Sequence, residues 1–236
     1  MPRMRAEGKA EFQVAGETAR RTQAARRGES DRRMLRAATR LFARQGVAGT
    51  SLAEVGVAAG YSRGLPVERF GSKRGLIEAL LDSMAAWFET RVAASPGGRR
   101  GVAAVIERID AHVDGARRSP LATAALYAVY VESLGAAPAL RPRVNALIDK
   151  WRADLAARLR EGQRDGEIRD DIDCAQQAAI ILGALRGLVI EHLMGDTTTD
   201  LDAIRDALVG LVRATLPAGE PAGGARRRRA GRTTGR

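Results

Sequence analysis

Cysteine and histidine are nearly missing from this chain of 236 residues, which contains one cysteine, Cys174, and two histidines, His112 and His192. One cysteine excludes an internal disulfide, and the three residues together are too few for a four-ligand zinc site. We therefore predict no metal, no cofactor and a reducing, cytoplasmic environment. Each of the three residues is expected at an ordinary surface or core position.

The chain also lacks the patterns of a β-sheet, a membrane protein and an enzyme. Aromatic residues make up only 4% of it, and no alternating run of Val, Ile and Thr predicts a strand. The most apolar stretch, residues 178–185, is too short to cross a bilayer, and no apolar segment indicates a signal peptide. Neither a nucleophile elbow nor a phosphate-binding loop is present. We therefore predict a soluble, all-α protein that is not an enzyme.

Positive charge is in excess, and it is unevenly distributed. The net charge is +11, of which residues 31–76 carry +6 and residues 217–236 carry +5, whereas residues 77–216 carry −3. A basic end on a neutral or acidic body is typical of a protein that binds a polyanion with one part of its surface. Charge alone leaves DNA, RNA and an acidic membrane open as partners.

Four regions follow from composition and from the spacing of apolar residues. Residues 1–28 have no lasting apolar stripe and are predicted to form a disordered basic arm, with order starting at Ser30 or Asp31. Residues 29–89 form a first domain, which includes the start of a long fourth helix. The other two regions are a second helical domain at 90–216 and a disordered Arg-rich tail at 217–236. The helices of the second domain are expected at 102–117, 120–135, 138–164, 173–194 and 199–216.

The first domain contains short helices separated by glycine-containing turns. Thr50 or Ser51 can cap the second helix, and Glu54, three residues after Ser51, completes a capping-box pattern. Ser62 can cap a third segment, and Ser72 the long fourth helix. Three short helices in the most basic part of the chain predict a helix-turn-helix, whose second helix enters the major groove of DNA.

The sequence from Arg32 to Ala79 resembles the N-terminal pattern of the TetR family of bacterial transcription regulators. The resemblance is carried by "MLRAATRLFARQGVAGTSLAEVGVAAGYSRG" and then by "FGSKRGL". A later segment, "EGQRDGEIRDDID", resembles the family's C-terminal region less specifically. The resemblance implies an N-terminal three-helix DNA-binding domain and a C-terminal helical domain for ligand binding and dimerisation.

The resemblance also implies which residues contact DNA. Thr50 and Ser51 match phosphate contacts at a helix N-terminus, where free N–H groups favour anions, and Lys73 matches a third phosphate contact. Arg63 is expected to bind a guanine edge in the major groove. The full set of implied contacts is Thr50, Ser51, Ser62, Arg63, Gly64, Leu65, Val67, Arg69 and Lys73.

The reading helix departs from the family pattern at three positions. Pro66, Val67 and Arg69 stand where an aliphatic residue, a tyrosine and a histidine are usual. Proline is tolerated in the first turn of a helix, because most N–H groups there lack intrahelical partners. Val67 removes a phenol that would bind phosphate, and Arg69 adds a charge that can replace it. Glu68 either accepts from a cytosine or, as we favour, pairs with a basic neighbour.

Large side chains of the second domain are implied as ligand contacts. In the family such residues line a cavity between helices, whereas aromatic residues at helical spacing are often only core, so both roles stay open. The group consists of Trp87, Phe88, Leu126, Tyr127, Tyr130 and Trp151. Arg186, in an otherwise apolar helix, either meets an anionic ligand or, as we favour, pairs with an acidic neighbour.

The last two predicted helices resemble the family's dimer-forming pair. The first offers small and apolar residues for close approach, and the second offers an apolar stripe, which predicts a two-fold symmetric homodimer. The members of the two surfaces are Ala178, Ala179, Leu182, Gly183, Leu185 and Gly187, and Leu201, Ile204, Leu208, Leu211 and Val212.

The features above predict a ligand-responsive, DNA-binding transcription regulator. We expect a homodimeric repressor that an unknown small-molecule effector releases from its double-stranded DNA operator, through a population shift between two conformations. The alternative is a constitutive, shape-dependent nucleic-acid-binding protein without an effector, in which the arm and the Arg-rich tail supply most of the affinity.

Overall fold

The computed structural model describes residues 4–93, 100–195 and 200–218, and within them it is helical throughout, apart from turns and one isolated β-bridge between Ile168 and Pro217. This confirms the all-α prediction. In chain order the elements are α1 (Met4–Gln45), α2 (Leu52–Ala58), α3 (Leu65–Phe70), α4 (Lys73–Ala93), α5 (Gly101–Arg118), α6 (Pro120–Leu134), η1 (Pro138–Leu140), α7 (Arg141–Arg164), α8 (Cys174–Leu193) and α9 (Leu201–Thr215).

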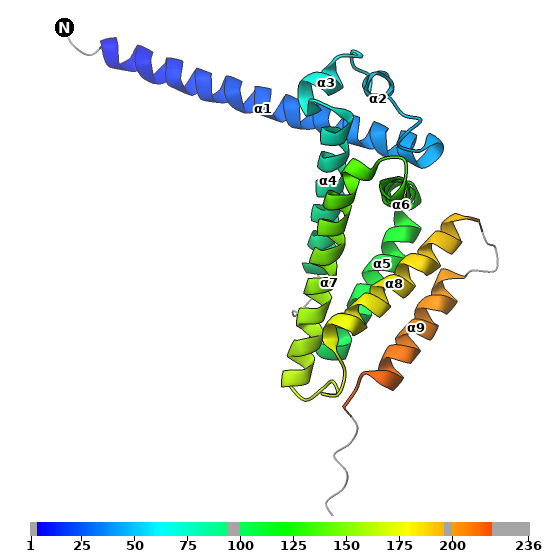
Figure 1. Cartoon of the computed structure of the whole chain (residues 1–236). Helices are drawn as coiled ribbons and strands as arrows, with labels where there is room; N and C mark the ends of the chain where they lie inside the picture. The colour runs from blue at the N-terminus through cyan, green and yellow to red at the C-terminus, as the bar shows by residue number, and fades with distance from the viewer. Residues whose placement is uncertain (1–3, 94–99, 196–199, 219–236) are drawn as a thin grey trace, which may run out of the picture.

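The helices form a head and a body that share one apolar core. Helix α2 packs on the C-terminal part of α1, and α3 packs on α2 to complete the head (Figure 1). Helix α4 runs from the head into the body of α5 to α9 (Figure 1), where ion pairs join it to α7. Helix α6 of the body packs against α1. The core cluster continues from Met34 and Phe42 on α1 to Leu182 on α8 and Val212 on α9. A displacement in the body can therefore reach the head through packed side chains.

Helix α1 is much longer than predicted, because it begins at Met4 and not at Ser30 or Asp31. Ser30 is no helix cap, since its hydroxyl donates to the Arg27 carbonyl at 2.8 Å within the helix. Glu29 pairs with Arg32 at 2.8 Å, one turn further on. The segment before Ser30 is rich in Ala, Arg, Glu and Gln, which favour helices even without an apolar stripe. The predicted basic arm is thus helical from Met4 onward.

Capping residues define the other helices of the head. The predicted capping box is confirmed: the Glu54 amide donates to Ser51 Oγ at 3.2 Å, and Glu54 accepts from the Ser51 amide at 2.7 Å. Ser72 caps α4, because its Oγ accepts from the Gly75 amide at 3.1 Å. Ser62 does not cap α3, whose N-cap is Gly64, without a side-chain hydrogen bond.

The body helices lie where the apolar spacing predicted them. Their ends lie within two residues of the predicted ends, apart from the start of α7, which the 3₁₀ turn η1 precedes. The chain end after α9 returns to the end of α7, where the Arg169 amide donates to the Leu216 carbonyl at 3.0 Å. The predicted Arg-rich tail lies, from residue 219 onward, outside the described residues.

Helix α8 is long and apolar enough to cross a membrane, with 20 residues and a mean hydropathy of 1.3. Sequence reasoning considered only the shorter stretch at 178–185. A single helix of this kind is weak support for a membrane span, because the core helix of a soluble protein has the same properties. Helix α8 buries Leu182, Leu185 and Val189 against the rest of the body.

Candidate functional site

The turn between α2 and α3 is closely packed, and Pro66 is part of that packing. A Cβ atom at Gly56 would lie 2.4 Å from the Ser62 carbonyl oxygen and 3.1 Å from Pro66 Cδ. Glycine is therefore required where α3 crosses α2. Pro66 is buried at the second position of α3, where its missing N–H leaves no helical hydrogen bond unmade. The proline that departs from the family pattern thus supports the helix-turn-helix.

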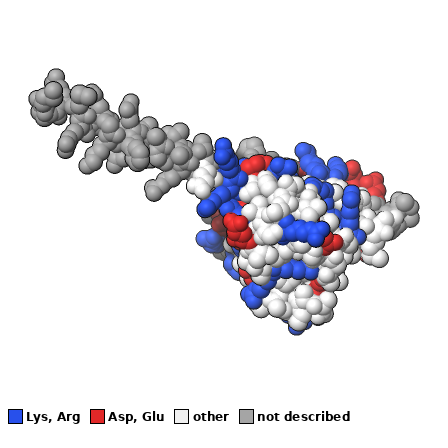
Figure 2. Space-filling model, turned by 90° about the horizontal axis from the view of Figure 1, so that it is seen from above, with Lys and Arg blue, Asp and Glu red and all other residues white. Residues whose placement is uncertain are grey.

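Most of the predicted DNA contacts lie on one exposed part of the head. Ser51 at the start of α2, Ser62 and Arg63 in the turn, and Gly64 and Val67 at the start of α3 are exposed. Leu65 is half-buried and packs against the core. Figure 2 views the molecule from above the head of Figure 1 and shows Lys and Arg side chains spread over it, with fewer Asp and Glu. This surface can meet a polyanion with its charges still hydrated.

Two of the predicted DNA contacts have partners inside the head. Thr50 is 2% exposed, and its hydroxyl donates to the Gly46 carbonyl at 2.8 Å. Arg69 binds Asp31 of α1 through two hydrogen bonds, Nε to Oδ1 at 2.8 Å and Nη2 to Oδ2 at 2.5 Å. Asp31 also raises the pKa of Arg69. Both side chains thus stabilise the head from within, and phosphate contact by either residue stays a prediction.

Lys73 and Glu68 remain at the surface of the head. Lys73 Nζ donates to the Ala48 carbonyl at 3.2 Å, which leaves its other two N–H groups for a further acceptor. Glu68 is exposed, and within the described part of the chain it forms no ion pair with Arg63 or Lys73. Its charge acts on Arg69 by raising the pKa of that guanidinium, after the larger effect of Asp31.

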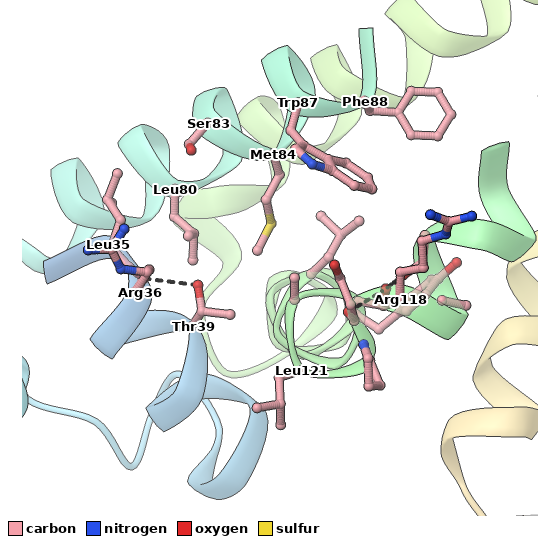
Figure 3. Close-up of a pocket in the computed structure, with 18 of the residues that line it drawn as sticks. Leu35, Arg36, Thr39, Leu80, Ser83, Met84, Trp87, Phe88, Arg118 and Leu121 are labelled. Carbon is pink, nitrogen blue, oxygen red and sulfur yellow. Dashed lines mark hydrogen bonds between the residues drawn. The ribbon is translucent and has the colours of Figure 1, made fainter. Parts of the chain in front are cut away.

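A pocket of about 760 Å³ lies between the head and the body. Figure 3 shows Leu35, Arg36 and Thr39 of α1 at one side of it and Leu80, Met84 and Trp87 of α4 at another. The ends of α5 and α6 close it with Arg118 and Leu121. Most of this lining is apolar, so the pocket can hold an organic molecule of moderate size.

Five of the six predicted pocket residues line this pocket, namely Trp87, Phe88, Leu126, Tyr127 and Trp151. The sixth, Tyr130, does not line it, although its ring packs edge-on against Tyr127 at a centroid distance of 5.7 Å. Sequence reasoning assigned α1 to DNA binding alone and did not foresee that it also forms a wall of the pocket.

The inner wall of the pocket is built of aromatic rings around His112. The ring of Phe88 meets His112 edge-on at 6.2 Å and Trp151 at 5.5 Å between centroids. His112 Nε2 lies 3.4 Å from the Tyr127 hydroxyl. Burial, followed by the positive charges of Arg108 and Arg186, lowers the pKa of His112 to about 3. His112 is therefore a neutral, half-buried side chain at physiological pH.

Glu132 of α6 joins the body to the head. Its carboxylate accepts from the backbone amides of Val47 at 2.5 Å and Ala48 at 2.7 Å, in the turn between α1 and α2. A Cβ atom at Gly46 would lie 2.9 Å from Glu132 Oε1, so the carboxylate lies close against this turn. The same turn receives the Lys73 ammonium at the Ala48 carbonyl. Helices α6 and α4, which both line the pocket, thus both bind one turn of the head.

Two family profiles match the chain on either side of the junction between head and body. "Bacterial regulatory proteins, tetR family" matches residues 34–80, and "Tetracyclin repressor-like, C-terminal domain" matches residues 101–208. The chain belongs to the TetR family. TetR regulators are DNA-binding transcription regulators and are generally not enzymes. A comparison with curated protein sequences finds no significant match.

Solved TetR-type structures share this fold. A TetR transcriptional regulator from Chloroflexus aurantiacus is 28% identical, with a TM-score of 0.73, and the alignment covers 83% of this chain and 100% of that one. A transcriptional regulator from Saccharomonospora viridis in complex with choline is 22% identical, with a TM-score of 0.70 and coverages of 80% and 98%. The fatty acid degradation regulator FadR from Bacillus halodurans is 18% identical, with a TM-score of 0.69 and coverages of 78% and 94%.

The contacts of three residues were not foreseen from the sequence: Asp31 with Arg69, His112 with Phe88, and Glu132 with the turn after α1. His112 was placed at an ordinary surface or core position, and nothing in its neighbourhood along the chain distinguishes it. Glu132 carried a signal, because it is the one charged residue in the otherwise apolar helix Pro120–Leu134. A lone carboxylate on an apolar helix needs a polar partner from another element.

Proposed function

We propose that this TetR protein is a homodimeric repressor, acting in the cytoplasm, that leaves its DNA operator when a small molecule occupies the pocket between head and body. The DNA contacts that we retain are Ser51, Ser62, Gly64 and Lys73 for positioning, together with Arg63 for reading a base edge. Leu65 and Val67 supply apolar contact in the groove. Thr50 and Arg69 stabilise the head from within.

The proposed ligand response rests on one observation, namely which helices line the pocket. Helix α1 contributes Leu35 to the pocket and belongs to the head, while α6 contributes Leu121 and holds the head through Glu132. A ligand that favours one arrangement of α1 against α6 therefore changes the population of head positions by its differential affinity for the two arrangements. The solved structure of a related fold with choline supports a ligand pocket in this one.

The exposed faces of α8 and α9 support the dimer. On α8 the exposed stripe recurs at helical spacing and is apolar, with Ile180 64% and Met194 81% exposed. No atom lies within 4 Å of a Cβ placed at Gly183 or Gly187, between them on that stripe. An unpartnered apolar stripe with small residues suits close approach of a second copy. Of the other predicted members, Ala178, Leu182, Leu185, Leu201 and Val212 are buried in the body, whereas Leu211 of α9 is 58% exposed.

Selection of bound duplexes from a random DNA library, followed by binding measurements at fixed salt, tests the regulator. We expect the selected operator to bind at least about 1,000-fold more tightly than unrelated duplex of the same length. A ligand of the pocket should then lower the affinity for the operator.

The alternative, a constitutive shape-dependent binder, gives the opposite result in the same assay. Affinity would depend steeply on salt, but the ratio between operator and unrelated DNA would stay near one. That outcome would refute sequence-specific regulation, and an operator complex that no pocket ligand weakens would refute the effector response alone.

A further inference from the structure

Several buried polar atoms behind the inner wall of the pocket have no hydrogen-bond partner among the described residues. They come from four consecutive helices, α5 to α8, and all except the histidine nitrogen are donors only or hydroxyls. These atoms are Arg108 Nε and Nη2, His112 Nδ1, Tyr130 OH, Trp151 Nε1 and Arg186 Nη2. Because a buried polar group without a partner costs free energy, such a cluster requires an explanation.

Arg108 is a buried cation with almost no compensating negative charge. Its side chain is 4% exposed, and the one carboxylate near it is Asp154, with Oδ2 at 3.9 Å from Nη1. Asp154 is 44% exposed and also pairs with Arg158 at 3.3 Å. The neighbouring Glu107 does not neutralise Arg108, since its own Oε1 is buried without a partner. Burial lowers the pKa of Arg108 to about 10, so the guanidinium stays charged at neutral pH.

Arg186 adds a second cation to the same interior. The favoured prediction of a salt bridge was wrong, because no carboxylate pairs with Arg186 in the part of the chain that the structure describes. Its charge lowers the pKa values of Arg108 and His112, which places the three groups within electrostatic reach of one another. The interior of the body therefore presents two guanidinium groups, a phenol and an indole N–H, and neither guanidinium pairs with the buried carboxylate of Glu107.

This cluster adjoins the pocket. The Arg108 guanidinium lies over the ring of Phe88, at 4.4 Å from its centroid, and 5.5 Å from that of Trp151. Phe88, Trp151 and His112 all line the pocket. Arg108 and His112 are four residues apart on α5 and so lie on one face of it. The unpaired donors thus lie next to the aromatic side chains that line the pocket.

The arginines that line the outer part of the pocket are paired or, like Arg40, exposed to water. Arg36 binds Glu29 at 3.3 Å, and Arg118 binds Asp114 at 3.0 Å. Both are more than half exposed, so water screens their charge. A negatively charged ligand group gains more from the unpaired, desolvated guanidinium groups inside than from the paired ones at the surface.

We infer that the effector is an organic carboxylate whose apolar body fills the pocket and whose carboxylate group binds Arg108 and Arg186 behind it. This inference rests on the proposed ligand response and names the chemical class of the ligand. The planar guanidinium fork matches a carboxylate, and the Tyr130 hydroxyl and Trp151 N–H supply further donors. The site selects against a cationic ligand, which would face two like charges in a medium of low dielectric constant.

Displacement of a neutral fluorescent probe tests the inference. N-phenyl-1-naphthylamine, which is uncharged and apolar, reports occupancy of the pocket in the full-length protein, and decanoate and decan-1-ol compete with it. We expect decanoate to displace the probe at a concentration at least tenfold lower than decan-1-ol does. Arg186→Gln should remove this preference with little change for decan-1-ol. Arg164→Gln, which removes an exposed charge from the far end of α7, is the matched control and should retain the preference.

Thermal unfolding without ligand gives a second readout that does not depend on the probe. Since an unpaired buried cation is costly, Arg186→Gln should unfold at the same temperature as the wild type or at a higher one. Equal displacement by decanoate and decan-1-ol, or an unchanged preference in Arg186→Gln, would overturn the carboxylate site and leave the pocket intact. Failure of the neutral probe to bind the wild type would overturn the pocket as well, while operator selection tests DNA binding independently.

Discussion

The arginines of the head and those of the body have opposite surroundings. In the head, Arg63 is exposed at the start of the reading helix, and Arg69 has a full partner in Asp31. In the body, Arg108 and Arg186 are buried or half-buried with guanidinium nitrogens that lack partners. Exposed charges attract a partner at long range, and salt weakens this attraction. Buried, unpaired charges interact strongly only with a charged group that enters the protein interior. We thus propose that arginine binds DNA in the head and a small organic anion in the body.

The largest expected effect comes from a substitution that disrupts the dimer interface of the body and leaves every residue of the head unchanged. Leu211, a member of the predicted dimer stripe, is 58% exposed on α9. Leu211→Arg should separate the subunits and lower operator affinity more than about 100-fold, because one head alone makes half of the contacts. Sedimentation and fluorescence anisotropy measure the two effects. Asn145→Arg, on an exposed part of α7, should leave both unchanged, and a stable dimer in Leu211→Arg would place the interface elsewhere.

Within the head, substitution of Arg63 tests whether an exposed cation contacts a base edge in addition to attracting phosphate. Arg63→Ala should cost about 1 to 3 kcal/mol of operator binding and relax the preference at one base pair. The measurement is binding to an operator and to its single-base variants. If the variant loses the same factor on every sequence, Arg63 contacts only the backbone.

The burial of His112 in the body and the positive charges near it should make the free energy of unfolding depend on pH in the acidic range. Its folded-state pKa of about 3 lies below the ordinary histidine value of 6.5, so between these values the unfolded chain binds the proton more strongly. The contribution is fully present above pH 6.5 and is lost as the pH falls towards 3, by up to about 1.4 kcal/mol per pH unit. Urea unfolding of His112→Gln should show a correspondingly weaker pH dependence. His192→Gln should keep the wild-type dependence, and identical curves for all three proteins would contradict the assignment.

The smallest expected effect concerns Lys73, a cation of the head that we expect to bind a phosphate without contacting a base. Lys73→Ala should reduce the slope of log affinity against log salt by about 0.9, the loss of one phosphate contact. The order of preference among operator variants should stay the same, in contrast to Arg63→Ala. A changed order would mean that Lys73 also orients the reading helix.

Local patterns predicted the capping box and the turns of the head, whereas the start of α1 and the helix contacts of the body could not be predicted. Caps such as Ser51 with Glu54 act over three residues, so a local pattern contains the whole interaction. The pocket depends on which helices meet, and the contacts that decide this join residues far apart in sequence. Asp31 and Arg69 are 38 positions apart, and Glu132 and Val47 are 85 apart. Apolar spacing indicates that a face is buried and does not name its partner, which is why α1 was not foreseen in the pocket wall.

The bond between Asp31 and Arg69 fixes the angle of α3 to the same helix that lines the pocket. Asp31 and Leu35 are one turn apart on α1, so a ligand that shifts α1 carries the reading helix with it as one rigid piece. Each half-site would then keep its preferred bases while the distance between the two half-sites changes. Operators lengthened or shortened by one base pair, about 3.4 Å, at their centre are therefore expected to lose affinity for the free protein and regain part of it for the liganded one.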